Sequence, residues 1–153
     1  MIKVNVIVKD NTWRKYIKNP DIYLKNKLKK IQDDKFFSKN NVYVFSLLLS
    51  GTKEIKLLNK KFRKKNKTTD ILSFPYQVKR DLKKQRSQKS EVYLGDIIIN
   101  VKKINFESQK IFKDHFNILW VHGLLHLFGY DHKKEKNYKK MKFFENKFLK
   151  KLQ

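Results

Sequence analysis

The chain carries four short segments in which apolar residues either alternate with polar ones or follow one another without interruption. Alternation with a period of two is typical of a strand that buries one face, and an unbroken apolar run is typical of a strand that buries both. Pro75 places the third segment at a sheet edge or ends it, and Gly95 marks a bulge or a close backbone approach in the fourth. The predicted strands are residues 2–8, 42–49, 70–76 and 93–101.

Four other segments repeat apolar residues every three or four positions, which predicts amphipathic helices. Thr52 is expected to cap the second of them, and a break is expected near Asp114 in the third. The predicted helices are residues 21–37, 52–65, 106–128 and 135–152. Residues 77–91 are polar and basic without any period, which predicts a mobile surface loop. Because 153 residues suit one domain, we predict a single domain, residues 1–153, of α+β or α/β class with one small sheet.

The charge balance is strongly basic, with 38 Lys and Arg against 14 Asp and Glu and a formal net charge of +24. Such a chain favours a polyanionic partner such as nucleic acid, because basic side chains release the counterions condensed on a phosphate backbone. The alternative is a composition set by A/T-rich codons, since Lys, Asn, Ile and Phe are all abundant and the lysines are spread along the chain. Net charge alone therefore leaves both explanations open.

The chain lacks cysteine and long apolar runs, and these absences limit the metal ligands it can offer and the cellular location we expect. The chain has no cysteine, so disulfides and thiolate ligands are excluded and any metal must bind to nitrogen or oxygen. No apolar run has the length of a membrane span, and the N-terminal run is too short and too charged for a signal peptide. We therefore expect a soluble cytoplasmic protein that has no membrane partner.

All four histidines fall within the eighteen residues from His115 to His132. On a helix, His122 and His126 lie on one face about 6 Å apart along the axis, which suits two ligands of one ion. Gly129 can end that helix in a left-handed conformation and return His132 as a third ligand. Three imidazoles with one open position are typical of a catalytic zinc site, and the alternative is a core histidine pair with a chance third. His115 lies about 10 Å away along the axis, too far for the same ion, and is expected to line the groove.

The spacing matches the HExxHxxGxxH pattern of the metzincin proteases except that Gly123 stands where those enzymes carry their general-base glutamate. A peptidase needs that carboxylate to take a proton from the attacking water and pass it to the leaving amine. The sequence therefore keeps the ligands of the pattern and lacks its base, which argues against amide hydrolysis by that route.

Three blocks resemble those of the YbeY family, the bacterial endoribonucleases and rRNA maturation factors. LNKKFRKKNKTTDILSFP resembles the family's LNxxYRxKxxxTDVLSFP, LGDIIIN resembles its LGDIVI, and HGLLHLFGYDH is its signature. The order and spacing of the three blocks agree with those of the family, and the resemblance covers most of the chain. Phe62 replaces the usual Tyr and keeps the ring, whereas the basic insert at 77–91 differs from the acidic or proline-containing stretch expected there.

The resemblance implies an α+β domain in which a small mixed sheet packs against several helices, one of them a zincin-like metal helix. It implies one zinc ion held by His122, His126 and His132, with Arg63 as the catalytic-site arginine and His122 also counted as catalytic. The activity implied is zinc-dependent, single-strand-specific endoribonuclease cleavage of rRNA, in 16S 3′-end maturation and ribosome quality control. The implied partners are ribosomal RNA and the small ribosomal subunit.

Phosphodiester cleavage suits these residues. A zinc ion lowers the pKa of bound water toward 7 or polarises a phosphoryl oxygen. Arg63 offers forked donors to the negative charge that develops on the phosphoryl group. Without the family block, Arg63 would be interpreted as a solvent-exposed charge on a lysine-rich helix. Either water or the RNA 2′-hydroxyl can serve as nucleophile. Asp96 and Asp131 are candidates for carboxylates that fix imidazole tautomers, or else they cap turns. The alternatives to the nuclease are a metalloprotease of metzincin type and a non-catalytic ribosome assembly factor with a structural histidine site.

Overall fold

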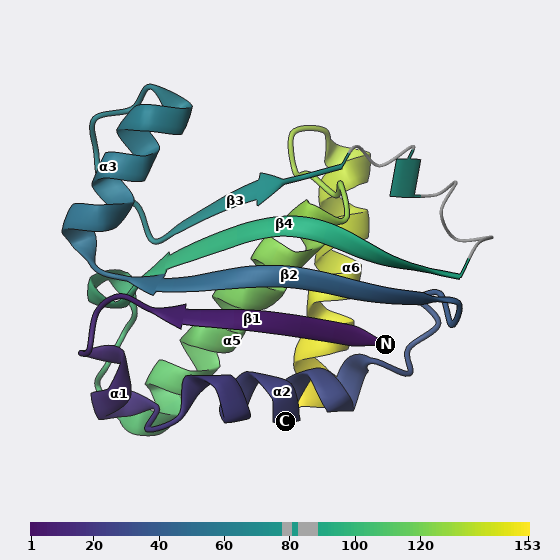
Figure 1. The fold of residues 1–153 in the computed structure, drawn as a ribbon, viewed down its shortest axis with the longest axis horizontal. Coiled ribbons are helices and arrows are strands. Elements are labelled where there is room, and N and C mark those ends of the chain that lie inside the picture. The colour runs from purple at the N-terminus through teal and green to yellow at the C-terminus, as the bar shows by residue number, and fades with distance from the viewer. Residues whose placement is uncertain (78–80, 83–88) are drawn as a thin grey trace.

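The computed structural model of the protein describes residues 1–77, 81–82 and 89–153. Within these residues a four-stranded sheet has the order β1-β2-β4-β3. The strands β1, β2 and β4 run parallel, and β3 pairs antiparallel with β4 at one edge (Figure 1). The strands are β1 (Ile2–Val8), β2 (Asn41–Ser50), β3 (Ile71–Pro75) and β4 (Ser90–Asn100). The predicted α+β class with a small mixed sheet is confirmed.

The two faces of the sheet are covered very differently (Figure 1). Helices α2 (Pro20–Ile31), α5 (Gln109–Leu127) and α6 (Glu135–Leu152) lie against one face and enclose the main core. Alternation along β2 explains this difference, because Phe45 and Leu47 take turns with half-buried residues that face the other way. Among the described residues, the helix on that other face is α3 (Thr52–Arg63), which packs on β3 and β4 over a small second cluster.

Two residues behave in the sheet as their types predict. Gly95 adopts φ 131° at a register shift between β2 and β4, and a Cβ there would lie 2.1 Å from the carbonyl oxygen of Phe74. Only glycine therefore fits this close approach of two backbones. Pro75 is the last residue of the edge strand β3, where its missing amide costs no hydrogen bond with a further strand.

Several predicted helix boundaries are wrong. Helix α2 ends at Ile31 rather than residue 37, because Asp34 turns the chain and accepts a hydrogen bond from the Phe36 amide at 2.9 Å. Thr52 does not cap α3, since Gly51 occupies the N-cap position. The helix ends at Arg63 rather than at residue 65.

Helix α5 is continuous through residue 114, so the predicted break there is also wrong. It begins at Gln109, after the Ser108 side chain accepts a hydrogen bond from the Ile111 amide at 3.1 Å. Asp114 instead forms an exposed ion pair with Lys110 one turn earlier, at 2.8 Å. The sequence prediction also omitted α1 (Trp13–Tyr16), whose Trp13 is fully buried.

The predicted loop at 77–91 lies partly outside the described residues. Of the part that is described, Leu82 is buried in the main core and residues 90–91 belong to β4, so these positions do not behave as a solvated loop. In the described ranges, none of the helices combines the length and the apolar character that crossing a bilayer requires.

Candidate metal centre

The end of α5 turns the chain so that a third histidine comes back beside the first two. Gly129 has φ 80°, and its amide donates to the carbonyl of His126 at 2.8 Å while the Tyr130 amide donates to that of Leu125 at 3.0 Å. These two bonds form a Schellman motif, which satisfies carbonyls that the helix end would otherwise leave unpaired. The turn expected at Gly129 is therefore present, and it brings His132 next to the helix.

The structure brings His122, His126 and His132 together, with one ring nitrogen of each within 4.8 Å of the other two. The Nε2 atoms of His122 and His126 are 2.9 Å apart. The centre of the His132 ring lies 5.6 Å from the centre of the His122 ring and 5.3 Å from that of the His126 ring. No fourth Asp, Glu, His or Cys joins this group in the part of the chain that the structure describes. The donor set consists of three imidazoles, as a zinc site with one open position requires.

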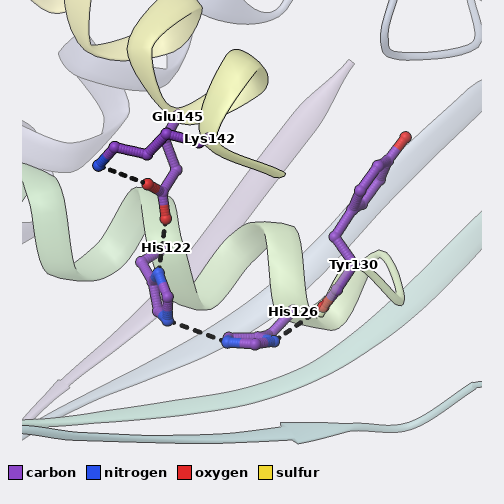
Figure 2. Close-up of polar contacts among 5 residues, drawn as sticks. All are labelled: His122, His126, Tyr130, Lys142 and Glu145. Carbon is purple, nitrogen blue, oxygen red and sulfur yellow. Dashed lines mark hydrogen bonds and ion pairs between the residues drawn. The ribbon is translucent and has the colours of Figure 1, made fainter. Parts of the chain in front are cut away.

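The other ring nitrogens of the two helical histidines are held by partners that only accept hydrogen bonds (Figure 2). His122 Nδ1 meets a carboxylate oxygen of Glu145 at 2.6 Å, and His126 Nδ1 meets the Tyr130 carbonyl at 2.8 Å. Both Nδ1 atoms therefore carry the hydrogen, and both Nε2 atoms present lone pairs to each other. Two lone pairs at 2.9 Å need a proton or a metal ion between them, and this arrangement fits a metal ion.

Burial sets the protonation states that a metal site needs. It lowers the pKa of His126, and the neighbouring His122 lowers it further, which keeps the ring neutral. Burial alone would raise the pKa of Glu145, but hydrogen bonds from His122 and Lys142 outweigh burial and lower it. The His126 ring is thus neutral, and Glu145 is an ionised carboxylate that orients the neighbouring His122 ring.

Arg63 lies at the same cavity, which has a volume of about 540 Å³ and is also lined by the three histidines. Its Nη2 atom donates to the Ser73 carbonyl at 2.8 Å, and its guanidinium carbon lies 5.4 Å from the centre of the Phe74 ring. Both contacts come from β3, so the edge strand fixes the position of this charge. The structure thus brings Arg63 and the histidines to one cavity.

Three other residues singled out from the sequence lie elsewhere or have other partners. His115 accepts a hydrogen bond from the Asn105 amide at 3.0 Å and is absent from the described lining of the cavity, contrary to the expectation of a groove residue. Asp96 lies on the opposite sheet face and accepts from the Tyr93 hydroxyl at 2.7 Å, so it is not placed to fix an imidazole. Asp131 lines the cavity and accepts from the Lys133 amide at 3.1 Å, as a turn-capping residue does.

Glu145 is the site residue that the sequence prediction omitted. It is 7% exposed and shares the buried stripe of α6 with three apolar residues, Met141, Phe148 and Leu152. A carboxylate is costly at such a position unless it is hydrogen-bonded, so its place on the apolar stripe is a signal that it has a partner.

Gly123 faces the sheet and packs closely against it. A Cβ at this position would lie 3.0 Å from two methyl carbons of Ile97 and 3.1 Å from one of Ile71. The side chain of a glutamate here would therefore enter the packing between α5 and the sheet. The position that carries the general base in metzincins is closed by packing in this protein.

Comparison with known proteins shows what the whole chain is similar to. The model of the family described as Endoribonuclease YbeY matches residues 8–153. The endoribonuclease YbeY of Pelagibacter ubique is 39% identical over 150 residues, covering 92% of this chain and 90% of the relative. That of Buchnera aphidicola subsp. Schizaphis graminum is 35% identical over 152 residues, covering 96% and 89%. The solution structure of a Thermotoga maritima protein aligns with a TM-score of 0.57 at 25% identity, over 99% of this chain and 89% of that one. The chain therefore belongs to the endoribonuclease YbeY family.

Proposed function

We propose that this chain is a zinc-dependent endoribonuclease that cleaves single-stranded ribosomal RNA, in the maturation of the 16S 3′ end and in ribosome quality control. The observation that carries the proposal is the convergence of three imidazole nitrogens, two of which have their other nitrogen fixed by an acceptor. Ribosomal RNA as substrate implies a cytoplasmic location and contact with the small ribosomal subunit.

His122, His126 and His132 would hold the ion, and Glu145 and the Tyr130 carbonyl would orient the first two rings. A zinc ion held there would supply a Lewis acid for a phosphodiester oxygen. Imidazole also suits copper, nickel and iron, and zinc is favoured here because three neutral nitrogens with an open position are its usual catalytic set.

Arg63 would bind the phosphodiester and stabilise the negative charge that develops on its oxygens during cleavage. A guanidinium has five N–H donors, and the bond to Ser73 directs this one while leaving further donors for a phosphate. The Phe74 ring beneath the guanidinium limits its other orientations. Arg63 is thus held in place before the substrate arrives, which is what electrostatic stabilisation of a transition state requires.

Two findings weigh against the alternatives. A peptidase of metzincin type needs a carboxylate at position 123, where this chain has a glycine packed closely against Ile97 and Ile71. A purely structural zinc site is closed by a fourth protein ligand, and none joins the three histidines within the described residues.

The test is cleavage of an end-labelled precursor of 16S rRNA by the purified chain, beside a duplex of the same sequence and a peptide substrate. We expect cleavage of the single strand alone, its loss after treatment with a chelator, and its return with added zinc. His126→Ala should be inactive and His115→Ala active, because only the first of these histidines faces the proposed ion. Undiminished cleavage by His126→Ala or in chelator would refute the metal mechanism.

A further inference from the structure

The sheet face opposite α5 and α6 carries a second hollow, of about 390 Å³, that the proposed cleavage chemistry does not use. Its wall is apolar and includes two rings in edge-to-face contact, Phe62 and Phe74, whose centroids are 5.4 Å apart. Phe62 is 56% exposed, and the nearby edge residue Tyr76 is 73% exposed and meets Tyr93 at 5.6 Å. Rings this exposed are available to stack with a ligand.

Strand β3 separates this hollow from the histidine cavity and belongs to both. Ile71, Leu72, Ser73 and Pro75 line the histidine cavity and Phe74 lines the second hollow, so this strand contributes residues to both. β3 is a strand of five residues at an edge of the sheet that the described residues form, so the two hollows lie on either side of this edge. Arg63 joins them directly, since it lines the first cavity and lies over the Phe74 ring of the second.

The surface beside this edge has the charge that a phosphate chain requires. Residues 52–67, which include α3, carry eight Lys and Arg against one Glu, and all eight are exposed. One of them, Lys61, places its Nζ atom 5.3 Å from the centre of the Phe62 ring. Cations that alternate with exposed rings are typical of surfaces that bind single-stranded nucleic acid without reading its sequence.

The polar floor of the hollow indicates which way a strand would lie. Asp96 accepts a hydrogen bond from Tyr93 at 2.7 Å, and the Tyr93 hydroxyl lies 3.0 Å from Ser46 Oγ. A carboxylate repels phosphates but accepts hydrogen bonds from the N–H groups of a base. Bases are therefore expected to face this floor, and phosphates to face the basic residues of α3.

We propose that single-stranded RNA leaving the histidine cavity crosses the edge strand β3 and stacks its bases on Phe62, Phe74 and Tyr76 on the opposite sheet face. The inference rests on the proposed function, because it extends the path of the same substrate. The aromatic face would strengthen binding of long single strands and would take no part in bond cleavage.

The test is equilibrium binding of a labelled single-stranded RNA of about 12 nucleotides, within the site sizes that such surfaces occupy. Binding is measured in chelator, so that no cleavage occurs, for the wild-type chain, Phe62→Ala and Tyr76→Ala. The matched control is Phe106→Ala, because Phe106 is 57% exposed and also contacts another ring, Tyr16, at 6.1 Å. We expect each test variant to bind roughly 5- to 150-fold more weakly, the range for one lost base stack, and the control to bind as the wild type does.

Two further arms identify what the rings bind. Phe62→Tyr keeps a ring and should keep the wild-type affinity. A second RNA lacks the bases of the nucleotides that lie outside the histidine cavity. It should bind the wild type and Phe62→Ala equally, because it offers no base to stack on the ring. Weaker binding of that abasic RNA by Phe62→Ala would mean that the ring acts on the backbone, and would overturn the proposal.

Failure of this inference is distinguishable from failure of the proposed function. A wild type that cleaves RNA with zinc, while Phe62→Ala and Tyr76→Ala bind the long strand unchanged, would overturn the aromatic path and leave the nuclease intact. A wild type that neither binds nor cleaves single-stranded RNA would overturn both. A chain that sediments as a dimer, and as a monomer once Phe62 is replaced with RNA binding unchanged, would assign this face to a second copy and overturn the proposal.

Discussion

His122 on α5 and Glu145 on α6 are joined by a hydrogen bond of 2.6 Å between Nδ1 and a carboxylate oxygen. The second oxygen of Glu145 accepts from Lys142 Nζ at 3.2 Å, one turn earlier on the same helix (Figure 2). The packing of α6 against α5 therefore determines the orientation of a proposed ligand. A carboxylate behind a ligating imidazole fixes its tautomer and raises its basicity.

Glu145→Gln should weaken zinc binding by roughly 10- to 100-fold, the usual effect of losing such a carboxylate. The amide keeps the size of the side chain but loses the negative charge that makes the His122 ring a stronger electron-pair donor to the metal. The measurement is the zinc dissociation constant by competition with a chelating dye. Glu135→Gln is the control, since Glu135 lies on the same helix in an exposed pair with Lys139. Equal affinities for the two variants would show that Glu145 does not support the ligand.

Arg63→Lys should lower the rate of RNA cleavage by roughly 100- to 1000-fold and leave zinc affinity unchanged. Lysine keeps the charge but loses the planar fork that Ser73 and Phe74 hold in place. Single-turnover cleavage with saturating RNA measures the effect on the chemical step. Lys60→Ala, which removes an exposed charge from the same helix, should cleave at nearly the wild-type rate. A similar loss in both variants would indicate general electrostatic attraction rather than a role at the reacting phosphate.

Gly123→Glu should destabilise the fold by about 3 kcal/mol or more and should create no peptidase. The new side chain meets Ile97 and Ile71 between α5 and the sheet, and its carboxylate would be buried without a partner. The free energy of unfolding in urea measures the cost. Ile118→Glu on the same helix is the control, because Ile118 is 47% exposed and should tolerate the charge. A stable Gly123→Glu chain that hydrolyses casein would contradict the packing argument.

Asp34 should make the stability of the protein depend on pH between about 4 and 2. Burial alone would raise the pKa of its carboxyl, but hydrogen bonds from Lys147, Lys151 and the Phe36 amide outweigh burial and lower it to about 2. The folded pKa is thus below the unfolded value of about 3.9, so the stabilisation is complete above that value and is lost as pH falls through 2. The shift corresponds to about 2 to 3 kcal/mol.

The measurement is the free energy of unfolding of the wild type and of Asp34→Asn across this range. The difference between them should be about 2 to 3 kcal/mol at pH 6 and should shrink toward zero near pH 2. Asp21→Asn, which removes one half of an exposed pair with Lys25, should differ little from the wild type at any pH. A constant difference between wild type and Asp34→Asn would show that the ion pairs do not set the pKa.

Local patterns made the strands and the histidine cluster predictable from the sequence. The period of two in β1 and the apolar run of β2 depend only on near neighbours, as does the glycine that ends α5. His122, His126 and His132 belong to one helix and the turn after it, so their spacing alone brought them together. The positions of β3 at an edge and of Pro75 at its end followed from the chemistry of proline.

Features that depend on distant partners could not be predicted in this way. Helix α2 ends early because Asp34 is fixed by Lys147 and Lys151, which lie 113 and 117 residues away. Glu145 lies 23 residues from His122 and meets it only because α6 packs on α5. Asp96 was a candidate either to fix an imidazole tautomer or to cap a turn, yet the alternation of β4 turns it to the opposite sheet face.

The central claim is that three imidazoles hold one ion at the cavity that Arg63 shares. Calorimetric titration of the metal-free chain with zinc tests it most directly, repeated with His126→Ala, His132→Ala and His115→Ala. We expect one ion per chain for the wild type and for His115→Ala, and binding weakened by about 100-fold or more for the other two, since a lost ligand costs more than a lost supporting carboxylate. Zinc bound to His126→Ala or His132→Ala as tightly as to the wild type would contradict the account.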